Sequence, residues 1–214
     1  MSLRVAVLLS GSGSNLQALL DAQAAADLGA EVVLVVADRA DAYGLQRALK
    51  HKVANAYVPL KRAHDPAIRS AWEQRLADVI AAFAPDLVVL AGFMRVLSAN
   101  FLQRFPNQVI NQHPALLPDD GSDTVRTEAG PVVPALRGAH VVADALRLKL
   151  PITGCTIHRA TPEVDNGPVL ARTEVPIRVD DTEETLHERI KAQERRMIVA
   201  VVQALAREHA QGFA

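Results

Sequence analysis

An amide and an imidazole stand two residues apart at the end of a short apolar run. The run Val109-Ile110 leads into Asn111 and His113, and prolines follow at 114 and 118. Side chains two residues apart in a strand point to the same face, and α/β folds place their chemistry at the carboxyl ends of strands. Asn111 and His113 could therefore converge on one reacting carbonyl, the amide donating a hydrogen bond and the imidazole handling a proton. A turn with a surface histidine is the alternative.

A glycine- and serine-rich segment could hold a phosphate. Ser10-Gly11-Ser12-Gly13-Ser14-Asn15 follows the first apolar run and opens a helical pattern. Glycines let backbone N–H groups approach an anion, and the N-terminus of a helix favours negative charge. The segment is similar to G-x-G-x-x-G, with Asp38 where a dinucleotide fold has its ribose acid, but Leu16 replaces the third glycine. A phosphate ligand is the main interpretation; a dinucleotide site and a plain tight turn are the alternatives.

A carboxylate could complete the Asn111 and His113 pair. Asp165 lies in Asp165-Asn166-Gly167-Pro168, between two strand patterns late in the chain. A loop carboxylate that reached His113 would fix the tautomer of the ring and favour its charged form. Taken alone, the segment is more often an ordinary Asx-type turn.

The elements that must position these groups alternate along the first two-thirds of the chain. We expect strands at 5–9, 31–37, 56–59, 87–90 and 109–110, and helices at 15–26, 42–50, 65–83 and, capped by Ser98, around Phe101. Continuous apolar strands between helices are typical of a parallel sheet that is covered on both faces. The fold class is therefore α/β, a Rossmann-like, mostly parallel twisted sheet with flanking helices.

The last third has a different pattern. Strands are expected at Cys155–His158 and Val169–Ile177, and a closing helix after the capping-box-like Asp181-Thr182-Glu183-Glu184, with Leu186, Ile190, Met197 and Val201 on one stripe. Residues 119–134 are polar, contain Gly and Pro, and show no sustained period. We expect a long mobile loop there, either a surface insert without a role or a neighbour of the active site.

Composition limits the other possibilities. The chain has 214 residues, a net charge of −1 and one cysteine, so neither a basic footprint for nucleic acid nor a disulfide framework is expected. Cys155 is interpreted as a buried strand residue, and the seven histidines show no metal-ligand spacing. No signal-peptide pattern and no apolar run of about 18 residues is present, so we expect a cytoplasmic protein without a membrane partner. A homodimer is plausible, although no feature defines its interface.

These motifs together resemble the phosphoribosylglycinamide formyltransferases, a branch of the folate-dependent formyltransferase superfamily. The resemblance runs from residue 4 to about residue 207. It rests on the S-G-x-G-S-N opening, on Leu90-Ala91-Gly92-Phe93-Met94-Arg95, on Asn111-x-His113-Pro114-x-Leu116-Leu117-Pro118 and on Asp165-x-Gly167-Pro168, which occur in this order.

The resemblance implies a direct transfer of a formyl group. The amine of 5'-phosphoribosylglycinamide would attack the formyl carbon of the co-substrate 10-formyltetrahydrofolate, a step of de novo purine biosynthesis. The reaction would pass through a tetrahedral intermediate and would use no metal. Asn111 and His113 would stabilise the oxyanion, while Asp165 would support His113 and relay a proton to the leaving folate nitrogen.

The resemblance also implies which residues bind the two substrates. The ribonucleotide would contact Gly13, Ser14, Asn15, Arg69 and Glu194. The folate would contact Met94, Arg95, Val96 and Leu97, together with Asn111 and Asp165. Supporting roles would fall to Thr156, His158 and His140. The alternatives are a solvated helix charge for Arg69 and Glu194, and a core position for Phe93-Met94 and His158.

The chain departs from the family pattern after Pro118. The family turn resumes at Arg137-Gly138-Ala139-His140, so residues from about 119 to 137 form an inserted loop. We expect one formyltransferase domain over 1–214, with a phosphate-binding half over about 1–105 and a folate-binding, catalytic half over about 106–214. The family further implies a cis bond between Leu117 and Pro118.

Other functions remain open at this stage. A formyltetrahydrofolate deformylase would use Asn111, His113 and Asp165 with water as the acceptor. A methionyl-tRNA formyltransferase would need a further nucleic-acid-binding domain, and a dinucleotide-dependent dehydrogenase would need the third glycine. A non-catalytic nucleotide- or folate-binding module is the last alternative.

Overall fold

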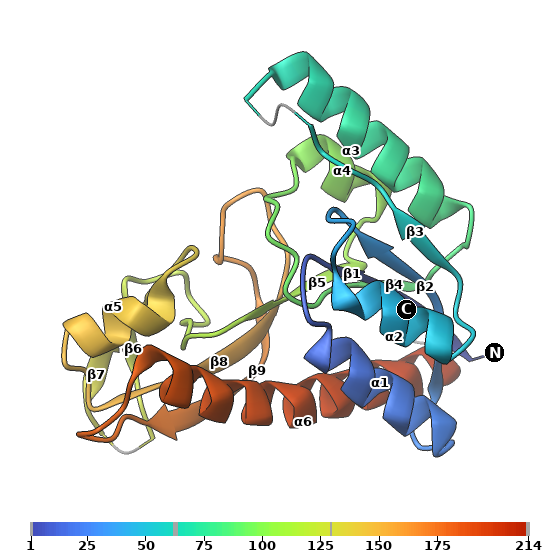
Figure 1. Cartoon of the computed structure of the whole chain (residues 1–214). Coiled ribbons are helices and arrows are strands. Elements are labelled where there is room, and N and C mark those ends of the chain that lie inside the picture. Colours follow the sequence, from blue (N-terminus) through green and yellow to red (C-terminus); the bar gives the residue numbers. More distant parts are fainter. Residues whose placement is uncertain (1, 62–63, 129, 213–214) are drawn as a thin grey trace.

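A twisted sheet with helices on both faces forms the body of the molecule (Figure 1). The computed structural model describes residues 2–61, 64–128 and 130–212. In chain order the elements are β1 (Leu3–Leu9), α1 (Ser14–Ala24), β2 (Ala30–Ala37), α2 (Tyr43–Lys50), β3 (Asn55–Tyr57), α3 (Pro66–Ala81), β4 (Leu87–Leu90), α4 (Ala99–Arg104), β5 (Val109–His113), β6 (Thr124–Arg126), β7 (Val132–Pro134), α5 (Val141–Arg147), β8 (Ile152–Arg159), β9 (Val169–Pro176) and α6 (Glu183–Ala210).

The first part of the sheet is parallel, as the buried apolar strands predict. The strand order is β3-β2-β1-β4-β5-β8-β9, and the pairings from β3 through β5 are all parallel. Strand β1 lies between β2 and β4. From β1 the chain continues to β2, toward one edge of the sheet, and from β4 it continues to β5, toward the other edge. Such a topological switch point opens a crevice at the carboxyl ends of the two strands. The glycine-rich segment and Gly92 follow these two ends.

Alternating side chains of β1 pack on opposite faces of the sheet. Val5, Val7 and Leu9 belong to a core with α1, α2 and α6, whereas Ala6 and Leu8 belong to a second core with α3 and α4. A strand that is buried on both faces has no polar positions, which explains the continuous apolar run. The apolar stripe expected on the last helix is confirmed, because Leu186, Ile190, Met197 and Val201 all lie in the first core.

The other edge of the sheet is antiparallel. Strand β8 pairs with β5 and with β9, and this pairing sets Asn111 opposite His158 and His113 opposite Thr156. The turn between β8 and β9 needs a glycine, because a Cβ on Gly167 would lie 1.8 Å from the carbonyl oxygen of Arg159. Thus one glycine lets the loop that carries Asp165 return close to its own strand.

The prediction that residues 119–134 form a long loop without regular structure is wrong in part, because this segment contains two short strands. Strands β6 and β7 pair as an antiparallel hairpin, in which Val125 and Val133 are buried against Leu116 and Ile152. The alternation of exposed and buried residues spans only three residues per strand, which is too short for a period to be recognised.

One helix was missed, and one further expectation needs correction. Helix α5 over Val141–Arg147 was not predicted, because its seven residues carry a short apolar pattern. No cis peptide bond occurs in the described parts of the chain, so the bond between Leu117 and Pro118 is trans and the expected cis bond is wrong. Even before proline the trans form is favoured by about 0.5–1 kcal/mol, and the chain here continues into the hairpin instead of the tight turn of the family.

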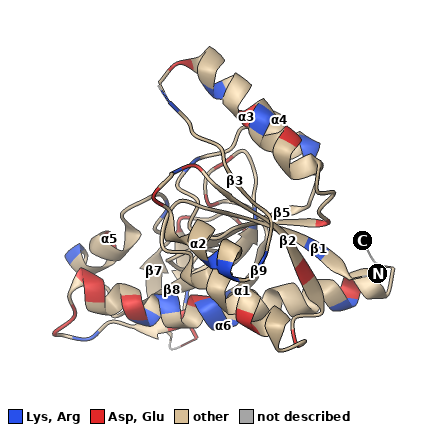
Figure 2. Cartoon of the chain, turned by 45° about the vertical axis from the view of Figure 1, so that its right-hand side comes forward, with Lys and Arg blue, Asp and Glu red and all other residues tan. Residues whose placement is uncertain are grey.

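Charged residues of both signs are mixed on the surface. Lys and Arg occur among Asp and Glu along α6 and along α3, whereas α4 carries Arg104 as its one charged residue (Figure 2). This distribution agrees with the net charge of −1. Over the described residues, no helix combines the length and the apolar character that crossing a membrane requires.

Candidate active site

The first wall of the site is the loop between β1 and α1. Gly13 adopts φ +68°, and a Cβ at this position would lie 2.8 Å from the Cα of Gly44. The backbone N–H of Gly44 donates to the carbonyl of Gly11 at 3.1 Å, which joins this loop to α2. The loop therefore opens α1 with a tight, glycine-dependent backbone, the geometry that brings N–H groups close to an anion.

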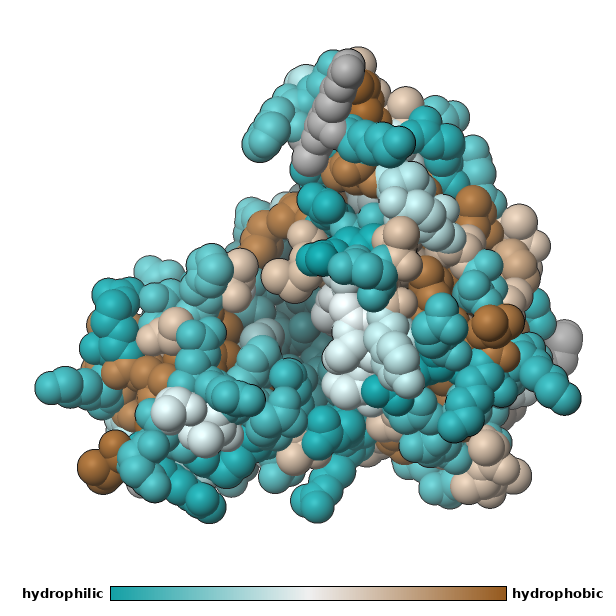
Figure 3. Space-filling view, in the orientation of Figure 1, coloured by the Kyte–Doolittle hydropathy of each residue, from teal (hydrophilic) through white to brown (hydrophobic). Residues whose placement is uncertain are grey.

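A cavity of about 410 Å³ begins at this loop. Figure 3 shows the face of the molecule hollowed between the part that carries α5 and the part that carries α1 and α2. The cavity brings together most of the residues expected from the sequence, namely Gly13, Ser14, Asn15, Met94, Arg95, Val96, Leu97, Asn111, His113, His158, Asp165 and Glu194.

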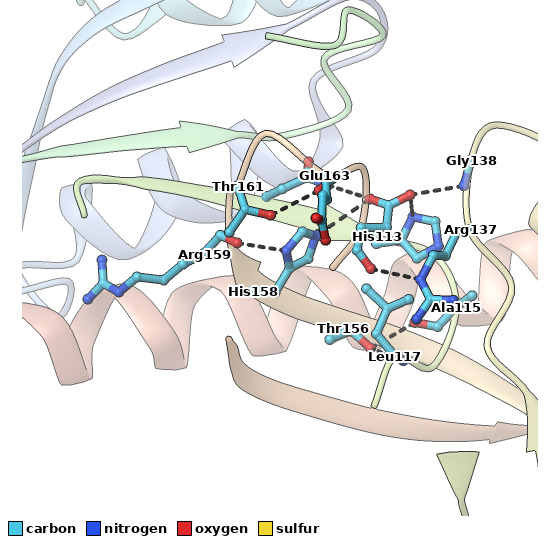
Figure 4. Close-up of polar contacts among 12 residues, drawn as sticks. His113, Ala115, Leu117, Arg137, Gly138, Thr156, His158, Arg159, Thr161 and Glu163 are labelled. Carbon is cyan, nitrogen blue, oxygen red and sulfur yellow. Dashed lines mark hydrogen bonds and ion pairs between the residues drawn. The ribbon is translucent and has the colours of Figure 1, made fainter. Parts of the chain in front are cut away.

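The carboxylate of Asp165 is the meeting point of the polar groups on β5. Its Oδ1 accepts a hydrogen bond from Asn111 Nδ2 at 3.2 Å, and its Oδ2 lies 3.3 Å from His113 Nδ1. The backbone N–H of Gly138 also donates to Oδ2, at 2.9 Å. Figure 4 shows His113 beside Arg137 and Gly138, with His158 on the adjoining strand. The expected contact of Asp165 with His113 is confirmed.

The tautomer of His113 follows from its second partner. Nε2 lies 2.8 Å from the carbonyl oxygen of Leu136, and a carbonyl can only accept, so Nε2 carries a proton. In the neutral ring Nδ1 is then an unprotonated nitrogen that faces the Asp165 carboxylate. This nitrogen and Asp165 Oδ2 together can accept one proton and hold it between them.

Burial sets the charge of this pair. Burial lowers the pKa of His113, and the Asp165 carboxylate and the Leu136 carbonyl oppose this shift without reversing it. Burial lowers the pKa by more than Asp165 raises it, because removing the imidazolium from water costs more than the carboxylate returns; the carboxylate still favours the charged ring, as expected from the sequence. Burial acts on Asp165 in the opposite sense, but His158, His113 and the Gly138 N–H outweigh it and keep the pKa of Asp165 below its usual range.

His158 orients Asn111. Its Nδ1 donates to the Arg159 carbonyl at 2.9 Å, so in the neutral ring Nε2 is an acceptor for Asn111 Nδ2 at 3.2 Å. The two N–H bonds of Asn111 therefore go to His158 and to Asp165, and this assigns the amide orientation. His158 is 2 % exposed. It therefore occupies a core position and also supports Asn111, so both roles considered from the sequence apply to it.

Thr156 holds the turn that follows His113. Its Oγ1 donates to the carbonyl of Ala115 at 2.8 Å and accepts from the N–H of Leu117 at 3.0 Å (Figure 4). Because Thr156 lies opposite His113 in the β5–β8 pairing, it fixes the backbone directly behind the imidazole.

The segment Met94–Leu97 forms the other wall of the cavity. Ser10 Oγ accepts from the Met94 N–H at 2.9 Å, and the Arg95 Nε lies 2.6 Å from Asp38 Oδ2. The Arg69 guanidinium donates to the Val96 carbonyl. Met94 and Val96 remain 64 % and 54 % exposed and present apolar surface at the cavity mouth.

Glu194 lies on the opposite side of the cavity and is 5 % exposed, so it is not on a solvated helix face. Its Oε2 accepts from Asn15 Nδ2 at 3.5 Å, and burial raises its pKa despite hydrogen bonds from Gln112 and Asn15. The neighbouring Cys155 is buried, and burial together with the Glu194 charge raises the thiol pKa to about 12. The cysteine is thus an unreactive strand residue, as expected.

Three residues lie elsewhere than their sequence roles suggest. Arg69 contacts the Met94–Leu97 segment through Val96 and is not among the residues that line the cavity with Gly13. His140 is exposed at the N-cap of α5 and does not line the cavity. Asp38 is 5 % exposed and does not line the cavity; its Oδ2 is paired with Arg95, and its buried Oδ1 has no hydrogen-bond partner among the described residues.

Sequence reasoning missed several residues of the site. Leu136, Arg137 and Gly138 contact His113 and Asp165, yet only Gly138 was noted, as an equivalent of a family glycine. Gln112 is buried beside Glu194, and its Oε1 finds no hydrogen-bond partner in the described residues. For Leu136, Arg137 and Gly138, the one available signal in the sequence was the departure from the family pattern after Pro118. Among the described residues, no cluster of three or more His, Cys, Asp or Glu side chains could hold a metal ion.

Comparison with known proteins agrees with this geometry. The formyl transferase family model matches residues 3–202. The phosphoribosylglycinamide formyltransferase of Mycobacterium tuberculosis is 44% identical over 205 residues, which cover 95% of this chain and 85% of that protein. The Escherichia coli enzyme of the same name is 34% identical over 94% of this chain and 85% of its own length.

A solved structure leads to the same family. The glycinamide ribonucleotide transformylase 1 of Symbiobacterium toebii superposes with a TM-score of 0.82 at 36% identity, over 96% of this chain and 88% of the other. The sequence match, the fold and the polar groups gathered around Asp165 agree with one another. The chain belongs to the formyl transferase family and, within it, to the phosphoribosylglycinamide formyltransferases.

Proposed function

We propose that this protein transfers the formyl group of 10-formyltetrahydrofolate to the amine of 5'-phosphoribosylglycinamide, a step of purine biosynthesis. One observation carries the proposal: Asn111 Nδ2 and His113 Nδ1 both lie against Asp165, in a cavity that has the glycine loop along one wall. Homologues of this chain carry the name of this activity. The two substrates are small molecules, and the domain proposed for the reaction spans residues 1–214.

The glycine loop is proposed to bind the phosphate of the ribonucleotide. Gly13 has a left-handed φ, Ser14 begins α1, and both line the cavity. Backbone N–H groups at a helix N-terminus and a serine hydroxyl are suitable donors for a phosphate. Asn15 and Glu194 lie next to each other deeper in the cavity, where their polar atoms suit the hydroxyl groups of a ribose.

The segment Met94–Leu97 is proposed to bind the pterin of the folate. The exposed side chains of Met94 and Val96 can cover an aromatic ring, while the backbone N–H and C=O groups can read its polar edge. The segment is held from behind by Ser10, Asp38 and Arg69. Arg69 is therefore proposed to support the folate wall, in place of the ribonucleotide contact first expected.

The chemistry at the centre needs an oxyanion stabiliser and a proton acceptor. The amine nitrogen forms a bond to the formyl carbon, the carbonyl oxygen becomes an oxyanion, and the bond from the carbon to the folate nitrogen then breaks. Asn111 Nδ2 is proposed to turn its hydrogen bond from Asp165 to the oxyanion. The proton released by the amine is taken up between His113 Nδ1 and Asp165 Oδ2, which then return it to the leaving nitrogen.

A formyl-transfer assay tests this proposal. Purified protein is mixed with 10-formyltetrahydrofolate, with and without the ribonucleotide, and the release of tetrahydrofolate is followed by absorbance. Release that depends on the ribonucleotide is the expected result. Release at the same rate without it would instead assign a deformylase, and no release from folded protein would leave a binding module. A homodimer and a cytoplasmic location stay predictions from the sequence.

A further inference from the structure

Three consecutive residues at the base of the β6–β7 hairpin each contact His113 or Asp165. The carbonyl of Leu136 accepts from His113, and the N–H of Gly138 donates to the Asp165 carboxylate. Between them, Arg137 Nε donates to the backbone carbonyl of Asp165 at 3.2 Å. The first and third contacts use backbone atoms, so Arg137 is the member of this group that acts through its side chain.

The guanidinium of Arg137 joins two loops. Besides Asp165, it donates to the carbonyls of Gly121 at 3.2 Å and Ser122 at 2.7 Å, at the start of the hairpin, and lies 3.4 Å from Asp123 Oδ1. Its side chain is 24% exposed. Guanidinium N–H groups lie in a rigid fork that can satisfy several acceptors at once. Arg137 is therefore a fixed link, not a solvated surface charge.

The residue that Arg137 holds is in an unusual backbone conformation. Asp165 has φ +52°, a region that non-glycine residues adopt only when the surrounding structure imposes it. This conformation aims the carboxylate at Asn111 and His113 while the backbone carbonyl faces Arg137. The two loops are also in contact beside this link, because a Cβ on Gly121 would lie 2.8 Å from Asn166 Oδ1.

We propose that Arg137 is a positioning residue for the reaction, which it serves by holding the Asp165 loop against the start of the hairpin. This proposal rests on the proposed function and assigns a role to the segment that departs from the family pattern. Arg137 does not line the cavity. It fixes the place of the carboxylate, and a misplacement of about 1 Å in a reacting group can cost on the order of a hundredfold in rate.

The variant Arg137→Met tests the proposal, with Arg126→Met as its control. Arg126 is an exposed residue of β6, so its replacement removes the same charge from the same hairpin. We expect Arg137→Met to lower kcat at least about tenfold and to leave both KM values within about twofold. Arg137→Lys keeps the charge without the fork and should recover only part of kcat. A kcat for Arg137→Met equal to that of the unaltered protein, or an equal loss in Arg126→Met, would overturn the proposal.

A crystal structure of Arg137→Met provides a readout that does not depend on activity, with urea unfolding to confirm the fold. We expect the φ of Asp165 to leave the left-handed region, or its Oδ2 to move at least about 1 Å away from His113 Nδ1. An unmoved Asp165 would contradict the positioning role. If the unaltered protein shows no ribonucleotide-dependent transfer, the proposed function fails, and the structural comparison still decides whether Arg137 holds Asp165.

Discussion

The two ends of the cavity are built in different ways. The glycine-loop end lies where the parallel strands β1 and β4 stop, and its shape comes from Gly13 and from buried apolar strands. The Asp165 end lies on the antiparallel edge, where a strand register, a hairpin and a strained backbone bring polar groups together. The first end is built mainly from residues that lie close together in the sequence. The second end brings together residues that lie far apart in the sequence, namely Asn111, His113, residues 136–138, His158 and Asp165.

This difference separates binding from chemistry. A phosphate site can be made from one loop and one helix N-terminus, because the backbone supplies its donors. A site that moves a proton needs side chains at defined mutual distances, and such distances require contacts between distant segments. Damage at the glycine-loop end should therefore raise a KM, and damage at the Asp165 end should lower kcat.

The largest expected effect comes from Asp165→Asn. The substitution removes the negative charge and the proton-accepting oxygen beside His113, so we expect kcat to fall at least about a hundredfold while the fold is kept. Steady-state kinetics of the variant measure the loss. Asp120→Asn, in the exposed start of the hairpin, is the control and should keep full activity. A variant at position 165 that keeps its kcat would remove Asp165 from the reaction.

The second expected effect is on the binding of the ribonucleotide and leaves kcat largely unchanged. Gly13→Ala places a methyl group 2.8 Å from Gly44 Cα on a left-handed backbone, so the loop must shift, and the KM for the ribonucleotide should rise about tenfold. The kcat and the KM for the folate should change little. Gly29→Ala is the matched control, because Gly29 has a similar φ of +67°, does not line the cavity, and would place its Cβ at an ordinary 3.5 Å from Ala206 Cβ. A fall in kcat with unchanged KM would show that the two ends are not separable in this way.

A smaller effect is expected at the folate wall. Asp38→Asn weakens the buried ion pair with Arg95, so the KM for the folate should rise about fivefold. Asp41→Asn removes the carboxylate of an exposed pair with Arg39 and should change nothing measurable. Equal behaviour of the two variants would mean that the Arg95 pair does not support the segment Met94–Leu97.

The smallest effect concerns stability. Burial raises the pKa of Glu194 above its unfolded value, so the folded state binds the proton more tightly and stability is lost as pH rises from about 4.5 through the folded pKa. Glu194→Gln has no charge to bury. Its free energy of unfolding, relative to the unaltered protein, should therefore increase across this range of pH. Urea unfolding at pH 4 and pH 8 measures it, and a difference that does not change with pH would contradict the buried charge.

The same comparison explains what the sequence could predict. Strands β1, β2 and β4 and the start of β5 follow from continuous apolar runs, and α4 follows from its N-cap Ser98, because these signals are local. Asn111 and His113 could be assigned to one face of a strand for the same reason. Asp165 could be suggested as a partner of His113 from its turn motif, whereas the contact of His158 with Asn111 could not be predicted, because it depends on an antiparallel register that a single sequence does not specify.

The region after Pro118 was hardest to predict. Strands β6 and β7 have three residues each, and their buried Val125 and Val133 pack on Leu116 and Ile152, which come from other parts of the chain. Leu136 and Gly138 act through backbone atoms, so their side-chain types carry no signal of the contacts with His113 and Asp165.

The most direct test follows the formyl carbon itself. The folate donor is labelled with ¹³C at the formyl group and incubated with the protein and the ribonucleotide, and the products are read by NMR. The account predicts one labelled formamide carbon on the ribonucleotide amine for each tetrahydrofolate released, with the rate at least about a hundredfold lower in Asn111→Ala. Label that accumulates as free formate, or a rate unchanged in Asn111→Ala, would contradict it.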